Sequence, residues 1–421
     1  MTALARILEE FSTQRIAAPA RLAAAQALRE HSLPTRHDEN WHYANLRAIE
    51  GVPQFRPGGA PALQAAPLSL PAALPGFERL VFIDGRLHPK GCTPAALRLA
   101  GPQQESSADA AGAFEAAGDG RLGLIARMFA PEPRTLRISG TMALELIFVS
   151  TAAGGASYSD LSLELAAGAT LELVERSVDI PGGTAGETGE FCCSTLQLRL
   201  AGGAHLVHTR LLHGHERTLR YDTLSATVAE RASYQFRHLS TGGANARSSV
   251  QVRLLGREAV ADIRALAVAQ STHQADALYT VLHEAPGSRS NLVFRGIASE
   301  RAHVACSADV QVSPEAAGAR VLQSLRGLID GKGAEVNLRP RLTINTDDIQ
   351  AAHGATTGRL DEDLLFYLLS RGLAPAAARS LLKWAFLSET LGVVGPAALR
   401  KAAEWAVASG LSDAPAPELL Q

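Results

Sequence analysis

The stretch LSLEL-AAGA-TLELVE, residues 161–175, decides the fold class of this chain. Apolar and polar side chains alternate on both sides of a four-residue Ala/Gly turn, which is the pattern of two short β-strands joined by a tight turn. The arrangement recurs in LQLRL-AGGA-HLVHTRLL, LSATV-AERA-SYQFRHL, VQVRLL-GREA-VADIRAL and VFRGIA-SERA-HVACSADV. The turns centre near Gly168, Gly202, Glu230, Arg257 and Glu300, so 27 to 43 residues separate them without a strict period.

The whole zone from about Leu80 to Asn345 is therefore predicted to be a stack of short strands with few helices. A doubly wound α/β sheet is disfavoured, because its parallel strands need helices of roughly 10–15 residues between them. A β-solenoid needs no such helices, since each coil stacks on the previous one and buries a continuous inner stripe. The pattern alone leaves a jelly roll or a β-sandwich open as alternatives.

Both ends of the chain have helical patterns. From Met1 to about Arg47 the apolar spacing predicts two short helices, and residues 51–75 are rich in Pro, Gly and Ala, which predicts a linker or surface loop. After Leu364, apolar-striped segments ending near Gly372, Gly392 and Gly410 predict two to three further helices. We divide the chain into residues 1–79, a β core at 80–346, and a C-terminal segment at 347–421.

Composition excludes several functions. The 40 basic and 42 acidic residues are interspersed, which argues against nucleic acid as a partner. The Gly-rich segments lack the Lys-Ser/Thr ending of a phosphate loop, so we expect no nucleotide to be bound by this chain. No apolar run approaches the roughly 20 residues of a membrane span. Glu9 and Glu10 interrupt the first apolar stretch, which argues against a leader peptide and favours the cytoplasm.

The four cysteines show no C-x-x-C spacing, so neither a structural zinc site nor a self-contained cluster is expected. Cys192 and Cys193 are neighbours in a strand, so one should lie in the core and the other should face outward, with ordinary packing favoured over sulfur chemistry.

The histidines and acids of the strand zone give weak signals. His205 and His208 should face opposite ways, and His213 and His215 share a face without a third ligand nearby, so surface or groove positions are expected for all four. The pair Asp347-Asp348 is expected in a turn, since adjacent strand residues point apart and cannot flank one glycosidic bond.

One segment combines a strand, an isolated imidazole and a helix: LTINTDDIQAAHGATTGRLDEDLLFYLLSRGL, residues 342–373. The pair His353-Gly354 suggests a sharp turn, because glycine tolerates backbone conformations that other residues avoid. Thr357 or Gly358 could cap the following helix, whose leucines form an apolar stripe with Phe366 and Tyr367 at its flank.

This segment resembles the C-terminal motif of the SufB/SufD family of iron-sulfur cluster assembly scaffolds. Within that family the resemblance is closest to SufD, as the pattern DD-I-x-A-A-HGAT-x-G-x-L-D-E-D-x-x-FYL-x-SRG indicates. A weaker resemblance lies between Pro34 and Tyr43, in PTRHDENWHY, and a fainter one in HEAPGSRSNLVFRG at 283–296. The middle of the chain fits the family in pattern only.

The resemblance implies a right-handed parallel β-helix with helical segments at both ends. It implies a non-enzymatic scaffold subunit of a SufB-SufC-SufD-type complex, which assembles iron-sulfur clusters and passes them to apo-proteins. His353 would then be a ligand for iron or a transient cluster at an interface shared with SufB, near one end of the solenoid. The C-terminal helices, with Phe366, Tyr367 and Arg371, would bind a SufC-type ATPase. A homodimer of the isolated chain and a reduced flavin in the complex are left open.

The chain departs from the family at one position that bears on mechanism. Many SufD proteins carry a cysteine two residues before the histidine, whereas this chain has Ala351, so a local thiolate is excluded. Two rival hypotheses remain: a purely structural SufB paralogue that lends no ligand, and a carbohydrate-active β-helix enzyme, for which the sequence shows no obvious cluster of acids.

Overall fold

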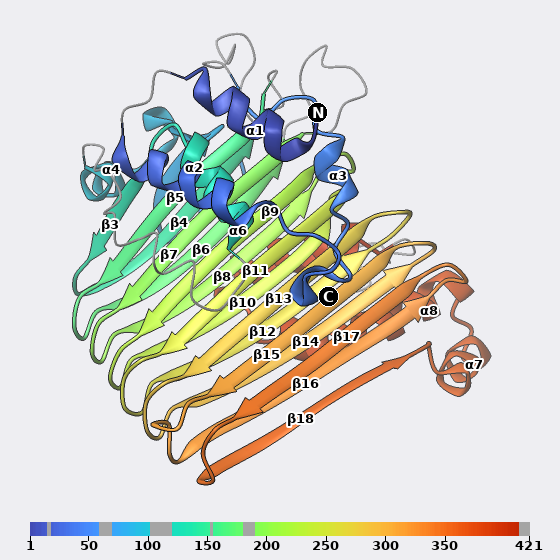
Figure 1. Cartoon of the computed structure of the whole chain (residues 1–421). Helices are drawn as coiled ribbons and strands as arrows, with labels where there is room; N and C mark the ends of the chain where they lie inside the picture. The colour runs from blue at the N-terminus through green and yellow to red at the C-terminus, as the bar shows by residue number, and fades with distance from the viewer. Residues whose placement is uncertain (15–17, 59–69, 102–119, 152–154, 180–189, 412–421) are drawn as a thin grey trace.

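The computed structural model describes residues 1–14, 18–58, 70–101, 120–151, 155–179 and 190–411. Within these ranges two long β-sheets face each other, and the chain passes from one to the other coil after coil (Figure 1). The strand order is β18-β16-β14-β12-β10-β8-β6-β4-β1-β2 in one sheet and β17-β15-β13-β11-β9-β7-β5-β3 in the other, so the two sheets are called even and odd below. Neighbouring strands are parallel except for the β1–β2 hairpin. The predicted mainly-β solenoid is confirmed.

The even sheet begins with the hairpin β1 (Glu78–Ile83) and β2 (Arg86–Leu87). Its other strands are β4 (Thr141–Ser150), β6 (Thr170–Asp179), β8 (His205–Gly214), β10 (Ser233–Gly242), β12 (Val260–Ala269), β14 (Arg289–Ser299), β16 (Ala319–Asp330) and β18 (Ile349–Gly358). The odd sheet contains β3 (Arg134–Ile138), β5 (Ser157–Leu165), β7 (Phe191–Leu200), β9 (Leu219–Val228), β11 (Asn245–Leu254), β13 (Gln274–His283), β15 (His303–Val312) and β17 (Glu335–Ile344).

Tight turns stack on one another along the solenoid. The turn after β5 bonds to the turn after β7, with Gly168 N donating to Gly202 O at 3.0 Å, and the next contact follows from Gly203 N to Glu230 O at 2.8 Å. Gly168 and Gly203 have positive φ values of 68° and 66°, which glycine adopts without steric cost. The equivalent turns further along place Arg231 and Glu258 at φ 54° and 58°. The turns predicted near these residues are therefore present, and they repeat coil by coil.

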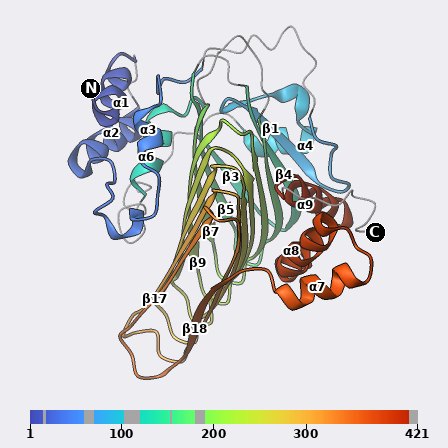
Figure 2. The same cartoon turned by 90° about the vertical axis from the view of Figure 1, so that its right-hand side faces the viewer.

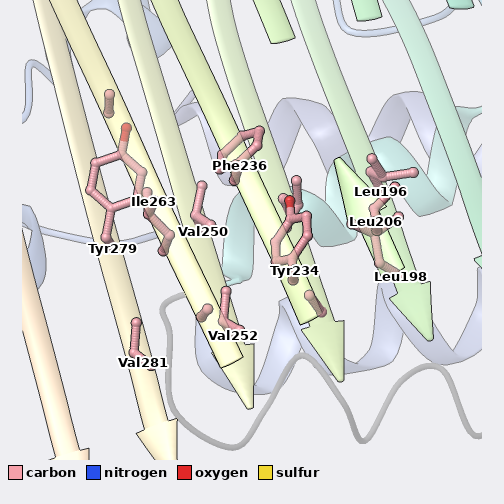
Figure 3. Packing of buried hydrophobic residues seen from close by; sticks show 14 of the residues in the cluster. Leu196, Leu198, Leu206, Tyr234, Phe236, Val250, Val252, Ile263, Tyr279 and Val281 are labelled. Carbon is pink, nitrogen blue, oxygen red and sulfur yellow. The ribbon is translucent and has the colours of Figure 1, made fainter. Parts of the chain in front are cut away.

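The space between the sheets, called the lumen below, is filled by alternate side chains from both sheets. Its central part is apolar, with Leu, Val, Ala, Tyr and Phe side chains packed across the gap (Figure 3). Tyr234 and Phe236 stack at 5.7 Å between ring centroids and are fully buried. Because each coil buries its inner stripe against the neighbouring coils, the burial of apolar area stabilises the whole stack.

The N-terminal helices cover the outer face of the odd sheet (Figure 2). They are α1 (Ala3–Ser12), α2 (Pro19–His31), the short α3 (Arg47–Glu50), and α6 (Arg121–Phe129). Phe129 stacks on Tyr158 of β5 at 5.2 Å, and Trp41 lies in a 3₁₀ turn (Glu39–Trp41) under the guanidinium of Arg247. The two helices expected before Arg47 are present, whereas the predicted linker at 51–75 lies partly outside the described residues.

The C-terminal helices α7 (Glu362–Ser370), α8 (Pro375–Leu391) and α9 (Ala397–Ser409) lie on the side of the even sheet (Figure 2). Apolar side chains of α8 and α9, such as Leu387 and Val407, pack on the outward leucines Leu239 and Leu266 of β10 and β12. α4 (Pro94–Ala100) and a 3₁₀ turn (Pro89–Gly91) lie beside β1. No helix in the described part of the chain is both long and apolar enough to cross a membrane.

Candidate functional site at the open end of the solenoid

The last coil, formed by β17 and β18, ends the stack of described strands and is called the open end below (Figure 1). All residues of β18 from Gln350 to Gly358 are exposed. The sequence-based expectation of a sharp turn at His353-Gly354 is wrong, because both residues lie in the middle of β18 and pair with β16. The ladder to β16 continues through Gly354 up to Gly358, so strand pairing overrides the local turn preference of glycine. β18 also lies beyond the boundary that we drew at residue 346.

His353 lies directly beside Gln323 of β16 in the strand register. Gln323 is buried, and its Nε2 donates to the carbonyl oxygens of Ala308 and Arg341, at 3.3 and 3.4 Å, on the opposite sheet. The side chain of Gln323 therefore points into the lumen, and paired residues of neighbouring strands share a face. His353 consequently lies on the lumen side of the open end, where it is accessible to solvent. Ala351, beside the buried Val321, occupies the same face.

The helix α7 follows β18 and has an exposed apolar surface. Its cap is Asp361 rather than Thr357 or Gly358, since Asp361 Oδ1 accepts a hydrogen bond of 2.9 Å from Leu364 N. No residue of α7 is buried, and the exposed fractions of Phe366 and Tyr367 are 72% and 53%.

Arg371 caps the other end of α7 and lies over the ring of Tyr367, with its guanidinium carbon 5.1 Å from the ring centroid. The three residues expected to contact a partner thus share one short exposed element. That element is separate from the strand that carries His353 (Figure 2).

The four cysteines are free and mostly buried. Cys192 and Cys193 do face opposite sides of β7, but the outward one is covered: Cys193 lies under α6, and its thiol donates to Leu122 O at 3.3 Å. Burial raises the pKa of Cys192, Cys193 and Cys306 above that of an ordinary thiol. These thiols are therefore protonated and weakly nucleophilic in the chain as it stands.

The expectation of surface or groove positions is wrong for His208, which is fully buried in the lumen. Its Nδ1 is 3.0 Å from the hydroxyl of Tyr234, and its Nε2 is 3.3 Å from Glu175 Oε1. Burial lowers the pKa of His208. Burial also opposes ionisation of Glu175, but Arg210 and His208 outweigh it and lower the pKa of this carboxyl to about 2. By contrast, His205 is exposed and contacts Ser233.

A second group of potential ligands was not anticipated from the sequence. Asp179 at the end of β6, Glu190 before β7 and Cys192 within β7 bring one oxygen or sulfur atom each to within 4.8 Å of one another. Nothing in the local sequence pattern joins Asp179 to the other two, because Asp179 ends a strand of the even sheet and Cys192 lies on a strand of the odd sheet, and only the packing of the two sheets brings their side chains together.

Fold and exposed coil together define a class of protein: a parallel β-solenoid with helices on both outer faces and an exposed end that presents a histidine. A family model described as "SUF system FeS cluster assembly, SufBD core domain" matches residues 148–386, which is more than half of the chain. The chain belongs to this family of SUF-system iron-sulfur cluster assembly proteins.

Individual proteins that are similar to this chain belong to the same family. The chain is 26% identical over 386 residues, 86% of each chain, to the iron-sulfur cluster assembly protein SufD of Escherichia coli strain K12. It is 33% identical over 175 residues to a SufBD family protein of Mycobacterium leprae, covering 39% of this chain and 45% of that one. A SufBD family protein of a Synechocystis strain is 28% identical over 205 residues, covering 48% of this chain and 45% of the relative. The resemblance to the SufB/SufD family, and to SufD within it, is thus confirmed.

Proposed function

We propose that this chain is the SufD-type subunit of a SufB-SufC-SufD-type complex. In this role it is a non-enzymatic scaffold that helps to assemble iron-sulfur clusters and to pass them to apo-proteins. Iron and sulfide are cargo, held transiently at an interface with a SufB-type paralogue, and ATP is hydrolysed by a SufC-type partner and not by this chain. Four free cysteines suit a reducing compartment, and we place the complex in the cytoplasm.

The position of His353 carries the proposal. The imidazole is exposed on the lumen side of the open end, so a second solenoid that stacks on β17 and β18 would bring its own residues against it. Imidazole is a good ligand for iron, and histidine replaces thiolate in some iron-sulfur centres. With alanine at position 351, the thiolates of such a shared site must come from the partner.

The open end also gives a reason for pairing. β18 is the terminal strand of the described even sheet, and an exposed strand edge favours pairing with another chain. A homologous solenoid would present a matching edge, so a SufB-type heterodimer satisfies the backbone of both chains. The same edge allows a homodimer when the isolated chain is studied without its partner.

The apolar surface of α7 supports a second contact. Phe366 and Tyr367 are exposed aromatic residues on a helix that leaves the solenoid, and a helix with such a face binds readily in a groove of a partner. We assign Phe366, Tyr367 and Arg371 to the SufC-type ATPase.

The test is reconstitution of the complex with His353→Ala. We expect unchanged melting temperature and partner binding, because His353 is exposed, together with a clear loss of cluster formed per complex, measured by visible absorbance after anaerobic supply of iron and sulfide. His205→Ala is the matched control, since it removes another exposed strand histidine. A full cluster yield in His353→Ala would mean that this subunit contributes only shape, as a structural SufB paralogue would. Failure to assemble with SufB-type and SufC-type partners would overturn the proposal itself.

A further inference from the structure

The lumen contains a polar compartment between the strands of the N-terminal coils. A cavity of about 40 Å³ lies there, enough for about three water molecules. Its wall includes side chains from both sheets: Ser150, Glu175, Cys192, Ser194, Arg210, Arg220 and Asp222. It belongs to the coils of β4 to β9, whereas His353 lies on the last strand at the other end of the stack.

Cys192 lies on the wall of this cavity and, together with two nearby carboxylates, has the chemistry of a metal-binding group. Asp179, Glu190 and Cys192 offer two carboxylate oxygens and one sulfur, all within 4.8 Å of one another. Ligand atoms around one tetrahedral ion lie roughly 3.4–3.6 Å apart, by the usual metal–oxygen and metal–sulfur lengths. Small side-chain rotations are enough to bring the three ligand atoms from their present separations to those around a bound ion. The side chain of Asp179 is 3% exposed and Cys192 is buried, whereas Glu190 is half-buried and lies on the solvent side of the three.

Neighbouring groups already hold these ligands in position. Asp179 Oδ2 accepts hydrogen bonds from His215 N at 2.9 Å and Thr218 Oγ1 at 2.8 Å, while Oδ1 accepts one of 2.8 Å from Arg220.

The hydroxyl of Ser150 donates to Glu190 and lies 3.2 Å from the sulfur of Cys192. Hydrogen-bonded carboxylates are the rule in metal sites, because the outer contacts orient the ligand oxygen and leave it a lone pair for the ion.

Asp222 provides an independent indication of a missing cation. It lines the same cavity as Cys192 and is 5% exposed, and its Oδ1 accepts a hydrogen bond from Ser194. Its Oδ2 has no hydrogen-bond partner among the described residues. Three guanidinium groups line the cavity, and each is paired with another carboxylate. Arg176 pairs with Glu145 at 3.1 Å, Arg210 with Glu175 at 2.5 Å and Arg220 with Asp179 at 2.8 Å. A buried carboxylate oxygen without a partner is costly unless water or a cation reaches it.

We propose that Asp179, Glu190 and Cys192 bind one divalent transition-metal ion of the zinc and ferrous type inside the solenoid, with Asp222 contacting it through water. Mixed oxygen and sulfur ligands suit borderline ions and disfavour magnesium and calcium. On binding, the sulfur forms its bond to the metal and the thiol proton leaves to solvent. Burial and then Glu190 raise the pKa of Cys192, and the charge of the ion reverses this effect. The site is formed by this chain alone and does not depend on the role of His353.

The test uses the full chain, freed of metal by a chelator and kept reduced under anaerobic conditions. Titration with Co²⁺ should give one equivalent of binding with a near-ultraviolet thiolate-to-cobalt charge-transfer band, which Zn²⁺ abolishes by displacement. Changes to outer contacts weaken metal sites about 10- to 100-fold, so loss of the sulfur ligand in Cys192→Ser should remove the band and raise the Kd at least ~100-fold.

Cys193→Ser is the matched control, because this neighbouring thiol faces the other side of β7 and should leave the band unchanged. Glu190→Gln keeps the shape of the side chain and should weaken binding even if Cys192→Ser folds poorly. The proposal is overturned if wild type gives no charge-transfer band, if Cys192→Ser retains it, or if Glu190→Gln binds Co²⁺ with an unchanged Kd.

Discussion

Burial, more than chemical type, determines the protonation state of individual side chains in the lumen. His238 of β10 is a buried imidazole whose Nδ1 lies 2.7 Å from the hydroxyl of Tyr279, and its ring stacks on Phe236 at 5.4 Å. Burial, with Arg210 and His208 nearby, lowers its pKa to about 3. The neutral ring therefore acts as a flat polar packing element and not as a proton carrier near neutral pH.

This pKa shift predicts a pH-dependent stability. Below about pH 6.5 the unfolded chain protonates His238 while the folded chain does not, so folding stability falls as the pH drops from there towards 3, by up to about 1.4 kcal/mol per pH unit for this group. His238→Gln should make the loss of melting temperature between about pH 7 and about pH 5 shallower than in wild type. Thermal unfolding followed by circular dichroism measures both slopes.

His205→Gln provides the control for the pH series, since this histidine is exposed and should leave the slope of wild type unchanged. An equal slope in His238→Gln and wild type would show that His238 does not contribute to the acid sensitivity.

At the level of the element, α7 differs from the other C-terminal helices. α8 and α9 bury apolar residues against the even sheet, whereas every described residue of α7 is at least partly exposed. Substitutions in α7 should therefore leave the fold intact and change only what the helix contacts in a partner.

We predict that the double variant Phe366→Ala/Tyr367→Ala lowers affinity for a SufC-type ATPase at least ~10-fold, because exposed aromatic anchors dominate such interfaces. Folding stability should change by less than about 0.5 kcal/mol, as is usual for surface positions. Calorimetric titration with the purified ATPase measures the affinity. Trp405→Ala on α9 is the control, since Trp405 is a 60% exposed aromatic residue outside α7. If the double variant binds as tightly as wild type, the contact lies elsewhere.

The whole molecule consists of a solenoid between two helical layers, and the C-terminal layer is attached through few polar contacts. Lys383 of α8 is fully buried and lies 2.5 Å from Asp330 at the end of β16, while Arg379 reaches the same carboxylate at 2.9 Å. Arg295 of β14 pairs with Glu389 of α8 at 2.6 Å. These ion pairs connect α8 to β14 and β16 of the even sheet, on which its apolar side chains also pack.

Lys383→Met should loosen this attachment. Removing one partner of a buried ion pair costs about 3–5 kcal/mol, and the solvent contact of Asp330 reduces that figure here. We expect faster hydrogen exchange in α7 to α9 with an unchanged strand signal in circular dichroism. Arg379→Met is the matched control on the same carboxylate, and because Arg379 is 43% exposed its loss should cost less than about 1 kcal/mol. Equal exchange rates in Lys383→Met and wild type would rule out this attachment.

The sequence predicted those features that depend on neighbours along the chain. Alternation in runs such as residues 161–175 identified the strands and their tight turns, and helical spacing identified the segments at both ends. The motif around His353 pointed to the family, which the comparison over residues 148–386 confirms.

Only the tertiary structure decided the contacts between residues that lie about one coil apart in the sequence. Arg247 and Asp276, whose numbers differ by 29, form such a contact. Pairing with β16 keeps Gly354 in a strand where local preference suggested a turn, because the backbone ladder outweighs the conformational freedom of one glycine. Packing between the sheets buries His208, for which alternation alone suggested a surface or groove position. Alternation also placed one of Cys192 and Cys193 outward, but only the structure shows that this one is Cys193 and that α6 covers it.

The packing of the even sheet against the odd sheet also brings Asp179 of β6 beside Glu190 and Cys192. Local periodicity determines which face of a strand a side chain lies on. Contacts across the lumen and between coils determine which residues pack against that face.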